Sequence, residues 1–409
     1  MDEPNRTDLT YRYERRRAVT AGMIETAGHT FLLLIAVRGF EAGATAKALV
    51  AAGGSVGLLI SPLVVTRVEA LGVPTAQAAA RLALLGASGF LGMALLPWLP
   101  AFVLGSILGT MCSSAAIPLL TQIYQDNYPE KIRGRLFSRT VMIRIAAAAL
   151  FSELAGRLLG ADMRNYRWLL LVFAAAFVFA AHCYSRIPSR PLRTVGGTHP
   201  FRALRFVRED PLFRHTLLCW MLMGFANLMM VPIRVEYLAN PKYQLGLSIG
   251  QVALLTGVVP NLARLVMSPI WGLLFDRMNF FALRVTLNFG FAIGILTFFL
   301  SDQLPGLIAG AIIYGISTAG GDVAWGLWVT KFAPHDRVAD YMSVHTFFTG
   351  VRGVLAPSVA FYLAGRLPLP TLGWISAGLI VVASVLLLPE IRTGRLARPA
   401  TALVEEVSE

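Results

Sequence analysis

Twelve long runs of apolar residues, almost free of charge, follow one another between Ala18 and Leu388. Each run is close to the ~20 residues that an α-helix needs to cross the hydrocarbon core of a bilayer. The predicted membrane spans are 18–37, 44–65, 76–97, 100–123, 138–158, 166–185, 214–233, 248–271, 282–301, 306–330, 339–362 and 371–389. These spans take up most of the 409 residues, which leaves no room for a separate soluble catalytic, nucleotide-binding or nucleic-acid-binding domain. The sequence therefore predicts an all-α membrane protein.

The longest connection between spans divides the chain into two six-helix halves. We expect two pseudo-symmetric bundles, because the sequence LAGRL recurs at 154–158 and 363–367, at corresponding places in the halves. Residues 201–208 of the connection are either a solvated basic segment or a short helix on anionic headgroups. The predicted parts are a cytoplasmic N-terminal tail (1–17), a first bundle (18–185), a basic linker (186–213), a second bundle (214–389) and a cytoplasmic C-terminal tail (390–409).

Basic residues predict the orientation of the chain. The tails and the even-numbered connections hold 24 of the 36 Lys and Arg residues, whereas the odd-numbered connections hold 8. Cytoplasmic loops of membrane proteins are enriched in Lys and Arg. Both termini and the central linker are therefore expected in the cytoplasm, in a plasma membrane and most simply a bacterial inner membrane. The same bias accounts for the net charge of +13 without a nucleic-acid partner.

Other common functions find no support in the sequence. The three cysteines have no paired spacing, which argues against a disulfide framework or a thiolate metal site. No Gly-x-x-x-x-Gly-Lys-Ser/Thr motif is present, so a nucleotide-driven pump is not expected. The dispersed histidines lack metal-ligand spacing, and no nucleophile and base converge. We therefore expect a monomer with no cofactor, no metal and no enzymatic activity, whose surroundings are the lipid bilayer.

One motif resembles a known family. The sequence GLLFDR at 272–277, followed by Arg284, is similar to the short-loop signature of the major facilitator superfamily. A second loop, Arg133-Gly134-Arg135, is also common in that family. The 6+6 layout extends the resemblance over essentially the whole chain. It implies a transporter that moves a solute by alternating access.

The chain also departs from the family pattern. In the first half, the signature glycine and aspartate are replaced by Pro62 and Thr66. The fifth span lacks the Gly-Pro motif of similar drug and proton antiporters, and the fourth span lacks a basic residue found in many proton-coupled members. These departures weaken the interpretation as a drug antiporter. They also leave a non-transporting sensor or partner-binding protein as an alternative.

Charged residues inside the predicted spans are the candidate site residues. A charge at the bilayer centre costs ~2.5–3.5 kcal/mol on insertion scales, so each one needs a partner or a wet cavity. Glu25 and His29 are four residues apart on the first span, where they would share a helix face and hold a proton between them. The alternative is a structural pair that only fixes the first span against a neighbour.

Four further charges are candidates for substrate binding. Arg144, Arg264 and Arg352 lie on spans that flank the cavity in the resembling family, and guanidinium forks match carboxylates and phosphates. Asp322 lies among glycines on the tenth span, and the alternative to a site role is an ion pair with Arg264 or Arg352. Arg144 has the further alternative of reaching the cytoplasmic surface.

Two uncharged residues complete the predicted binding site. Asn227 is on a span that lines the cavity in the resembling family, whereas for Trp325 packing is the stronger interpretation. The predicted function is secondary active transport of a small organic solute, either an organic anion or a hydrophobic compound for export, with proton coupling through Glu25 and His29.

The resemblance also implies a cytoplasmic gate. The signature aspartate of the family caps a helix of the opposite half, so Asp276 is expected to meet the start of the fifth span near Arg135. Gly272 and Arg277 complete the predicted gating residues. Because Thr66 replaces the aspartate in the first half, this gate should be latched on one side only.

Overall fold

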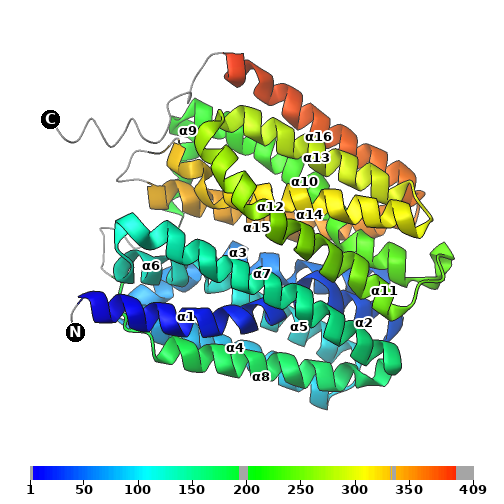
Figure 1. Cartoon of the computed structure of the whole chain (residues 1–409), viewed down its shortest axis with the longest axis horizontal. Helices are drawn as coiled ribbons and strands as arrows, with labels where there is room; N and C mark the ends of the chain where they lie inside the picture. Colours follow the sequence, from blue (N-terminus) through cyan, green and yellow to red (C-terminus); the bar gives the residue numbers. More distant parts are fainter. Residues whose placement is uncertain (1–2, 193–200, 332, 334–337, 393–409) are drawn as a thin grey trace. The chain divides into compact units, whose positions relative to one another are not determined.

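The computed structural model describes residues 3–192, 201–331, 333 and 338–392 (Figure 1). In this part of the chain nearly all residues are helical, and each predicted span corresponds to a helix or to consecutive helical pieces. The twelve-helix prediction is therefore confirmed. The C-terminal residues 393–409 of the predicted tail, and residues 193–200 of the linker, lie outside the described residues.

The first half contains six helical stretches, two of which change their geometry midway. They are α1 (Glu3–Thr26) with the π-helical η1 (Ala27–Phe31) and α2 (Leu32–Arg38), then α3 (Ala44–Ala70), α4 (Thr75–Leu95), α5 (Leu99–Ala115) with α6 (Ile117–Asn127), α7 (Glu130–Ala161), and α8 (Tyr166–Ser185), which follows the short η2 (Met163–Asn165).

The second half follows the same plan. After the short turns η3 (Arg202–Arg205) and α9 (Phe206–Glu209) come α10 (Pro211–Ala239), η4 (Pro241–Tyr243), α11 (Ile249–Ala253) with the π-helical η5 (Leu254–Val258) and α12 (Val259–Arg277), α13 (Phe280–Phe299), α14 (Leu304–Leu327) with η6 (Trp328–Lys331), α15 (Val338–Ala364) and α16 (Leu369–Arg392). Residues 202–209 of the linker thus form short helical turns.

Eleven helical stretches of the described chain are long and apolar enough to cross a membrane by length and composition alone. The remaining predicted span, 138–158, lies within α7 (Glu130–Ala161), which has the length but carries more charge. Its charged residues include Arg133, Arg135, Arg139, Arg144 and Arg157. The chain is a multi-pass membrane protein.

The N-terminal segment is helical from Glu3, where α1 begins, and its place in the cytoplasm stays a prediction. Polar contacts hold its first turns against α6. The Thr7 hydroxyl donates a hydrogen bond to the Asn127 carbonyl (2.8 Å), and the Asn127 side chain donates one to the Thr10 hydroxyl (2.9 Å). Glu14, only 1% exposed, accepts hydrogen bonds from Arg17 of the same helix and from the Tyr124 hydroxyl of α6. A polar helix is stable here because its polar groups are paired.

Contacts group the chain into two compact units. Unit 1 comprises Met1–Arg202, Val231–Val258 and Thr346–Gly365, and unit 2 comprises Ala203–Met230, Val259–His345 and Arg366–Glu409. Unit 1 therefore contains the helices of the first half together with the end of α10, all of α11 and η5, and most of α15. Unit 2 contains α12, α13, α14 and α16, of which α13 packs against both α14 and α16.

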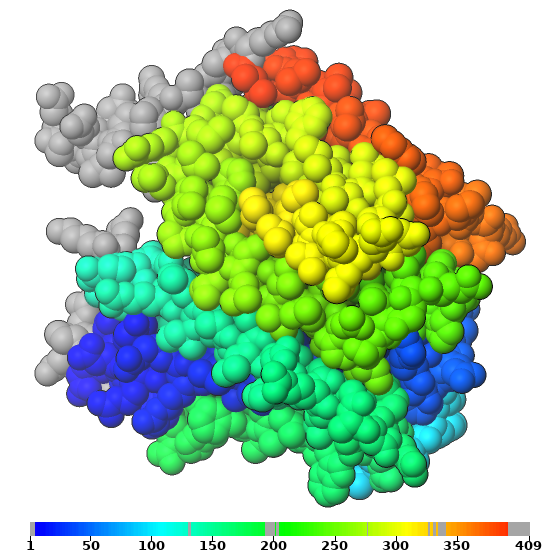
Figure 2. Space-filling model, turned by 45° about the vertical axis from the view of Figure 1, so that its right-hand side comes forward, coloured from blue at the N-terminus to red at the C-terminus, as the bar shows by residue number. Residues whose placement is uncertain are grey.

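In unit 1, α1 packs along α7, and α4 packs along both α5 and α8 (Figure 1). Aromatic rings fill the space between α4 and α8, where Phe90 lies 5.4 Å from both Phe173 and Phe177, measured between ring centroids. α11 and η5 pack against α7, and the surfaces of α7 and α11 meet in the space-filling view (Figure 2). These contacts place segments of the second half directly on helices of the first.

We call the end of unit 1 that carries residues 39–43, 162–165 and 240–248 the outer end. The charge bias predicts that it faces away from the cytoplasm. Its parts are tied together: the Arg38 guanidinium donates a hydrogen bond to the Leu247 carbonyl (3.2 Å). Deeper in the unit, the two π-helical turns touch, because the Thr30 hydroxyl of η1 donates to the Thr256 hydroxyl of η5 (3.2 Å).

Candidate functional site

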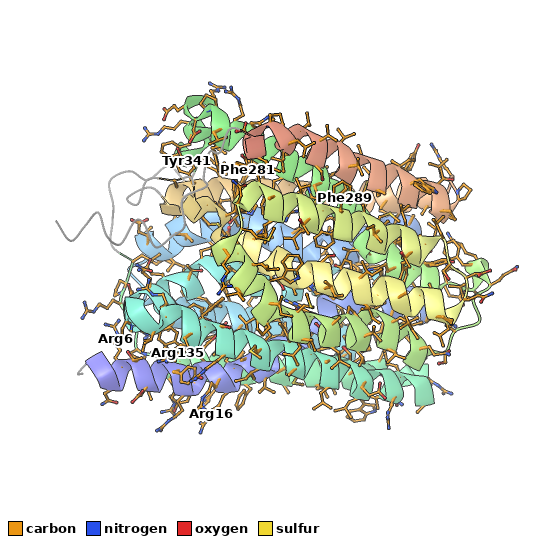
Figure 3. All side chains as sticks on the ribbon, turned by 45° about the horizontal axis from the view of Figure 1, so that its top comes forward. Arg6, Arg16, Arg135, Phe281, Phe289 and Tyr341 are labelled. Carbon is orange, nitrogen blue, oxygen red and sulfur yellow. The ribbon has the colours of Figure 1, made fainter. Side chains whose placement is uncertain are left out.

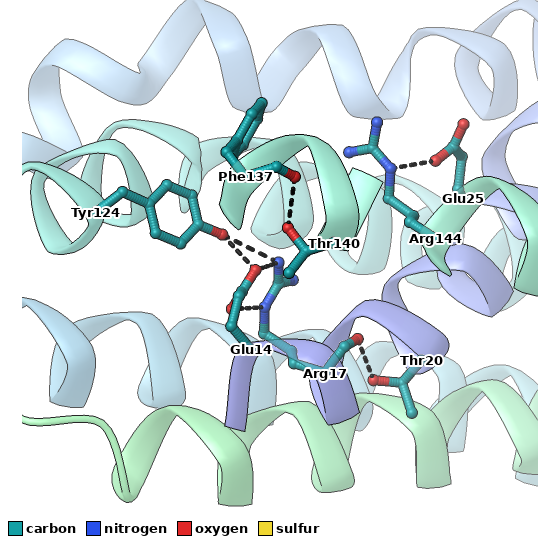
Figure 4. A network of polar contacts seen from close by, with 8 residues as sticks. All are labelled: Glu14, Arg17, Thr20, Glu25, Tyr124, Phe137, Thr140 and Arg144. Carbon is teal, nitrogen blue, oxygen red and sulfur yellow. Dashed lines mark hydrogen bonds and ion pairs between the residues drawn. The ribbon is translucent and has the colours of Figure 1, made fainter. Parts of the chain in front are cut away.

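Two of the predicted site residues form an ion pair inside unit 1. Arg144 Nε of α7 lies 3.1 Å from Glu25 Oε2 of α1, and both side chains are partly exposed, Arg144 by 34% and Glu25 by 18% (Figure 4). Gly22 brings the two helices this close, since a Cβ at that position would lie 2.3 Å from the Arg144 carbonyl oxygen. Arg144 is therefore positioned by α1, and whether it also reaches the cytoplasmic surface stays a prediction.

His29 lies in the π-helical turn that follows Glu25, and its side chain is exposed. Single π-helical turns within longer helices occur frequently at functional sites. The pairing of His29 with Glu25 stays a prediction, and the sequence interpretation did not identify Arg144 as a neighbour of the carboxylate. A contact between α1 and α7 joins residues 119 positions apart, which no helical periodicity reveals.

A second ion pair lies inside unit 2. Arg264 Nε of α12 donates a hydrogen bond to Asp322 Oδ2 of α14 (2.6 Å), and Arg264 Nη1 donates a longer one to Asn261 (3.4 Å). The guanidinium is buried, with 9% of its side chain exposed, whereas the Asp322 side chain is 42% exposed. The ion pair that the sequence offered as the alternative for Asp322 is thus formed. It leaves one side of the carboxylate accessible.

The remaining candidates for substrate binding occupy different parts of the fold. Arg352 is on the part of α15 that belongs to unit 1 and is only 6% exposed. Asn227 is half-buried on α10 in unit 2, and its buried amide oxygen accepts no hydrogen bond from the described residues. Trp325 of α14 lies beside the imidazole of His345, with 5.6 Å between ring centroids.

His345 belongs to an aromatic cluster that sequence reasoning missed. Its imidazole, 1% exposed, lies edge-on to Trp220 (5.4 Å) and Trp328 (5.1 Å), measured between ring centroids. Arg284, the basic residue after the family signature, is also buried here, with its guanidinium carbon 4.1 Å from the Trp220 ring centroid. Stacking on an aromatic face is a favourable position for a guanidinium withdrawn from water. The cluster joins α10, α13, η6 and α15.

The predicted gating residues lie at helix ends. Gly272 is on α12, where no atom of the described residues lies within 4 Å of the position of a Cβ, and Arg277 is exposed at the end of that helix. Arg135 is exposed near the start of α7 (Figure 3). The side chain of Asp276 lies outside the described residues, so the expected contact between Asp276 and the start of the fifth span stays a prediction.

One more buried ion pair went unrecognised in the sequence. Lys47 Nζ of α3 donates a hydrogen bond to Glu236 Oε1 of α10 (2.8 Å), and both side chains are buried, with 9% and 1% exposed. Both residues lie at the edges of predicted spans, where charges are common and attract no notice. They are 189 positions apart in the sequence, and only the packing within unit 1 brings them together.

The fold is that of a membrane transporter. Similar solved structures include a mutant of the nucleoside transporter NupG, with 12% identity, a TM-score of 0.76, and coverage of 93% of this chain and 99% of the other. A D-xylose-proton symporter has 16% identity, a TM-score of 0.66 and coverage of 94% and 96%. The human organic anion transporter MFSD10 (TETRAN) has 14% identity, a TM-score of 0.68 and coverage of 95% and 100%.

The family model of the Major Facilitator Superfamily matches residues 237–405, the part of the chain that holds the complete signature. No curated protein matches the sequence. The resemblance to this superfamily that the motifs indicated is confirmed for this part of the chain. The family and the neighbouring folds indicate a transporter rather than an enzyme.

Proposed function

We propose that the chain is a secondary active transporter that moves a small organic solute across the plasma membrane by alternating access. The observation that carries the proposal is a pair of partly exposed ion pairs within membrane-spanning helices, Glu25–Arg144 in unit 1 and Arg264–Asp322 in unit 2. A charge facing hydrocarbon is expensive, and intramembrane charges with an accessible side mark water-filled pathways.

An organic anion is the substrate class that we propose. The spans contain the guanidinium groups of Arg144, Arg264 and Arg352, and a guanidinium fork binds carboxylate or phosphate with two parallel hydrogen bonds. Arg352 is the main candidate. Its side chain on α15 is only 6% exposed, and burying a charge within a membrane-spanning helix is energetically costly. Asn227 and Trp325 would add an amide and an aromatic face to the binding site.

Proton coupling is proposed through Glu25 and His29. In the ion pair the Glu25 carboxylate faces Arg144, so protonation of Glu25 would release the guanidinium for a substrate anion or a new position. This competition for Glu25 between a proton and Arg144 is a physical means of coupling. His29, exposed beside the pair in the π-helical turn, would pass the proton to or from water.

Flux into proteoliposomes tests the transport proposal. Purified protein is first screened by thermal shift against organic anions, neutral metabolites and hydrophobic compounds, since a ligand of the folded state raises its stability. Each stabilising compound is then tested for uptake with and without an imposed pH gradient. Gradient-driven accumulation of an anion supports the proposal, whereas accumulation of neutral or hydrophobic compounds alone contradicts the anion class.

A sensor or partner-binding protein that retains the transporter fold is the alternative. It is favoured by the incomplete signature of the first half, with Pro62 and Thr66, and by a family-model match that begins only at residue 237. The same assay separates the two functions. A sensor would show a ligand-dependent thermal shift without net flux or counterflow exchange for any of the stabilising compounds.

A further inference from the structure

We infer that the Glu236 carboxylate is a proton-binding site that controls opening of the outer end, through its buried ion pair with Lys47. The inference rests on the proposed alternating access, because a pathway that opens to the outside must separate the helices that meet there. Glu236 and Lys47 are not among the residues proposed above for substrate binding, proton coupling or the cytoplasmic gate.

The geometry of the pair is that of a closed contact. Lys47 Nζ is 2.8 Å from Glu236 Oε1, and the Asn240 side chain donates a second hydrogen bond of 2.8 Å to the same oxygen. The Lys47 ammonium also lies 5.4 Å from the ring centroid of Phe361 on α15. Three helices, α3, α10 and α15, therefore converge on one buried charge pair at the outer end.

Close backbone packing also joins helices of the two halves elsewhere in unit 1. A Cβ on Gly350 of α15 would lie 2.5 Å from the Leu59 backbone nitrogen of α3, and one on Gly156 of α7 would lie 2.6 Å from the Cβ of Ala253 on α11. These contacts, like the pair between Thr30 and Thr256, join helices of the first half to helices of the second. The outer end is thus closed in this structure, and opening has to break the Lys47–Glu236 pair.

The chain connectivity decides which groups separate on opening. Lys47 is on α3, whereas Asn240, Lys242 and Tyr243 follow Glu236 within a few residues and remain beside it. Lys242 Nζ lies 3.6 Å from Glu236 Oε1. Burial and the nearby Glu236 charge raise the pKa of the Tyr243 phenol, so Tyr243 stays neutral. Within residues 234–243, the one charged residue besides Glu236 and Lys242 is Arg234, which is also buried on α10.

Protonation of Glu236 therefore destabilises the closed state more than the open state. When Glu236 takes a proton from outside water, it becomes a neutral acid and Lys47 keeps its charge. The closed state then contains a buried ammonium without a counter-ion, which is strongly unfavourable. In the open state Lys47 is hydrated and loses little. A ligand that binds one of two states better shifts the population toward it, so external acid favours opening.

Thiol labelling measures this opening without a substrate. The reporter is Thr256→Cys, which replaces a side chain that is 7% exposed, in a chain whose three buried native cysteines are changed to alanine. A membrane-impermeant maleimide is applied from outside. Thr45→Cys, at an exposed position at the start of α3, gives the intrinsic labelling rate at each pH. Because acid lowers the thiolate fraction, an acid-induced increase at residue 256 cannot come from the reagent.

We expect Glu236→Gln to speed labelling at residue 256 by about tenfold or more, the range expected for loss of a buried charged hydrogen bond. In the parent, labelling relative to the Thr45→Cys reference should rise as external pH falls, and Glu236→Gln should remove this pH dependence. The matched control is Glu153→Gln, which breaks an exposed pair with Arg157 on α7, at the same end, and should leave labelling unchanged.

The double variant Lys47→Met/Glu236→Gln separates opening from misfolding. It removes both charges of the buried pair, so it should unfold at a temperature near that of the parent and still label fast. Slow labelling of a folded double variant, or a pH dependence that survives in Glu236→Gln, overturns the inference. Because labelling needs no substrate, a chain that shows the expected labelling but no flux contradicts only the transport proposal.

Discussion

Replacing Gly22 by alanine should loosen the contact that holds the Glu25–Arg144 ion pair. A Cβ at residue 22 would lie 2.3 Å from the Arg144 carbonyl oxygen and 2.9 Å from both the Ala147 Cβ and the Ala148 nitrogen. Two of these three obstacles are backbone atoms of α7, which cannot rotate away as a side chain can. The helices α1 and α7 must therefore separate, at the residue that carries the guanidinium.

The expected destabilisation follows from two opposing effects. Overpacking a well-packed contact costs ~1–3 kcal/mol. Alanine is a better helix former than glycine by ~1 kcal/mol, which offsets part of that cost. Since the clash is with backbone, the overpacking cost should lie toward its upper range. We expect the free energy of unfolding of Gly22→Ala to fall by ~1–2 kcal/mol.

The measurement is reversible unfolding in mixed micelles with increasing SDS, followed by circular dichroism. Gly92→Ala is the matched control, because Gly92 lies on α4 and no atom in the described part of the chain is within 4 Å of its Cβ position. That variant should gain up to ~1 kcal/mol from helix propensity alone. If Gly22→Ala proves as stable as the parent, or more stable than Gly92→Ala, the close contact between α1 and α7 is wrong.

Three further predictions concern transport. Glu25→Gln should abolish pH-driven accumulation and preserve counterflow exchange, because exchange needs no net proton movement; unchanged pH-driven uptake would reject the coupling role. Arg352→Lys should weaken binding of the anion in the thermal-shift assay, because a point charge loses the bidentate fork, and normal binding with easier unfolding would indicate a structural ion pair instead. Asp276→Asn should shift the population toward the inward-facing state by at most ~1–2 kcal/mol, the upper range for a charge at a helix end; distances between spin labels on the cytoplasmic ends of α7 and α12 would measure it, and an unchanged distribution would reject the latch.

Helices were predictable from this sequence because length and hydropathy act locally. The N-terminal segment was not, since its helix depends on pairing Glu14 with Arg17 and Tyr124, a contact between α1 and α6. A polar segment without an apolar face is interpreted as a tail from the sequence alone, because its hydrogen-bonding partners are far away in the chain. The helix break at Ala116 between α5 and α6 has a mark in the sequence, because Pro118 lies in the first turn of α6 and proline disfavours a continuous helix across this point.

Ion pairs were predictable only where the number of possible partners was small. Asp322 had Arg264 as one of two named candidates, because acidic residues inside the spans are few. The ion pair of Glu25 with Arg144 was not predicted, because Arg144 is far away in the sequence and only the α1–α7 packing brings it close. Lys47 and Glu236 carried no signal at all, because charges at span edges are ordinary.

The π-helical turn at Ala27–Phe31 affects how this chain should be aligned with its relatives. A π-helical turn accommodates one residue more than an α-helical turn, so it is equivalent to a one-residue insertion in a regular helix. A relative with a regular first helix would be one residue shorter here. An alignment that places the gap in a neighbouring loop would shift the register between Glu25 and that loop, and would match His29 to a residue on a different helix face. The gap should therefore be placed within residues 27–31 when the first helix is compared across the superfamily.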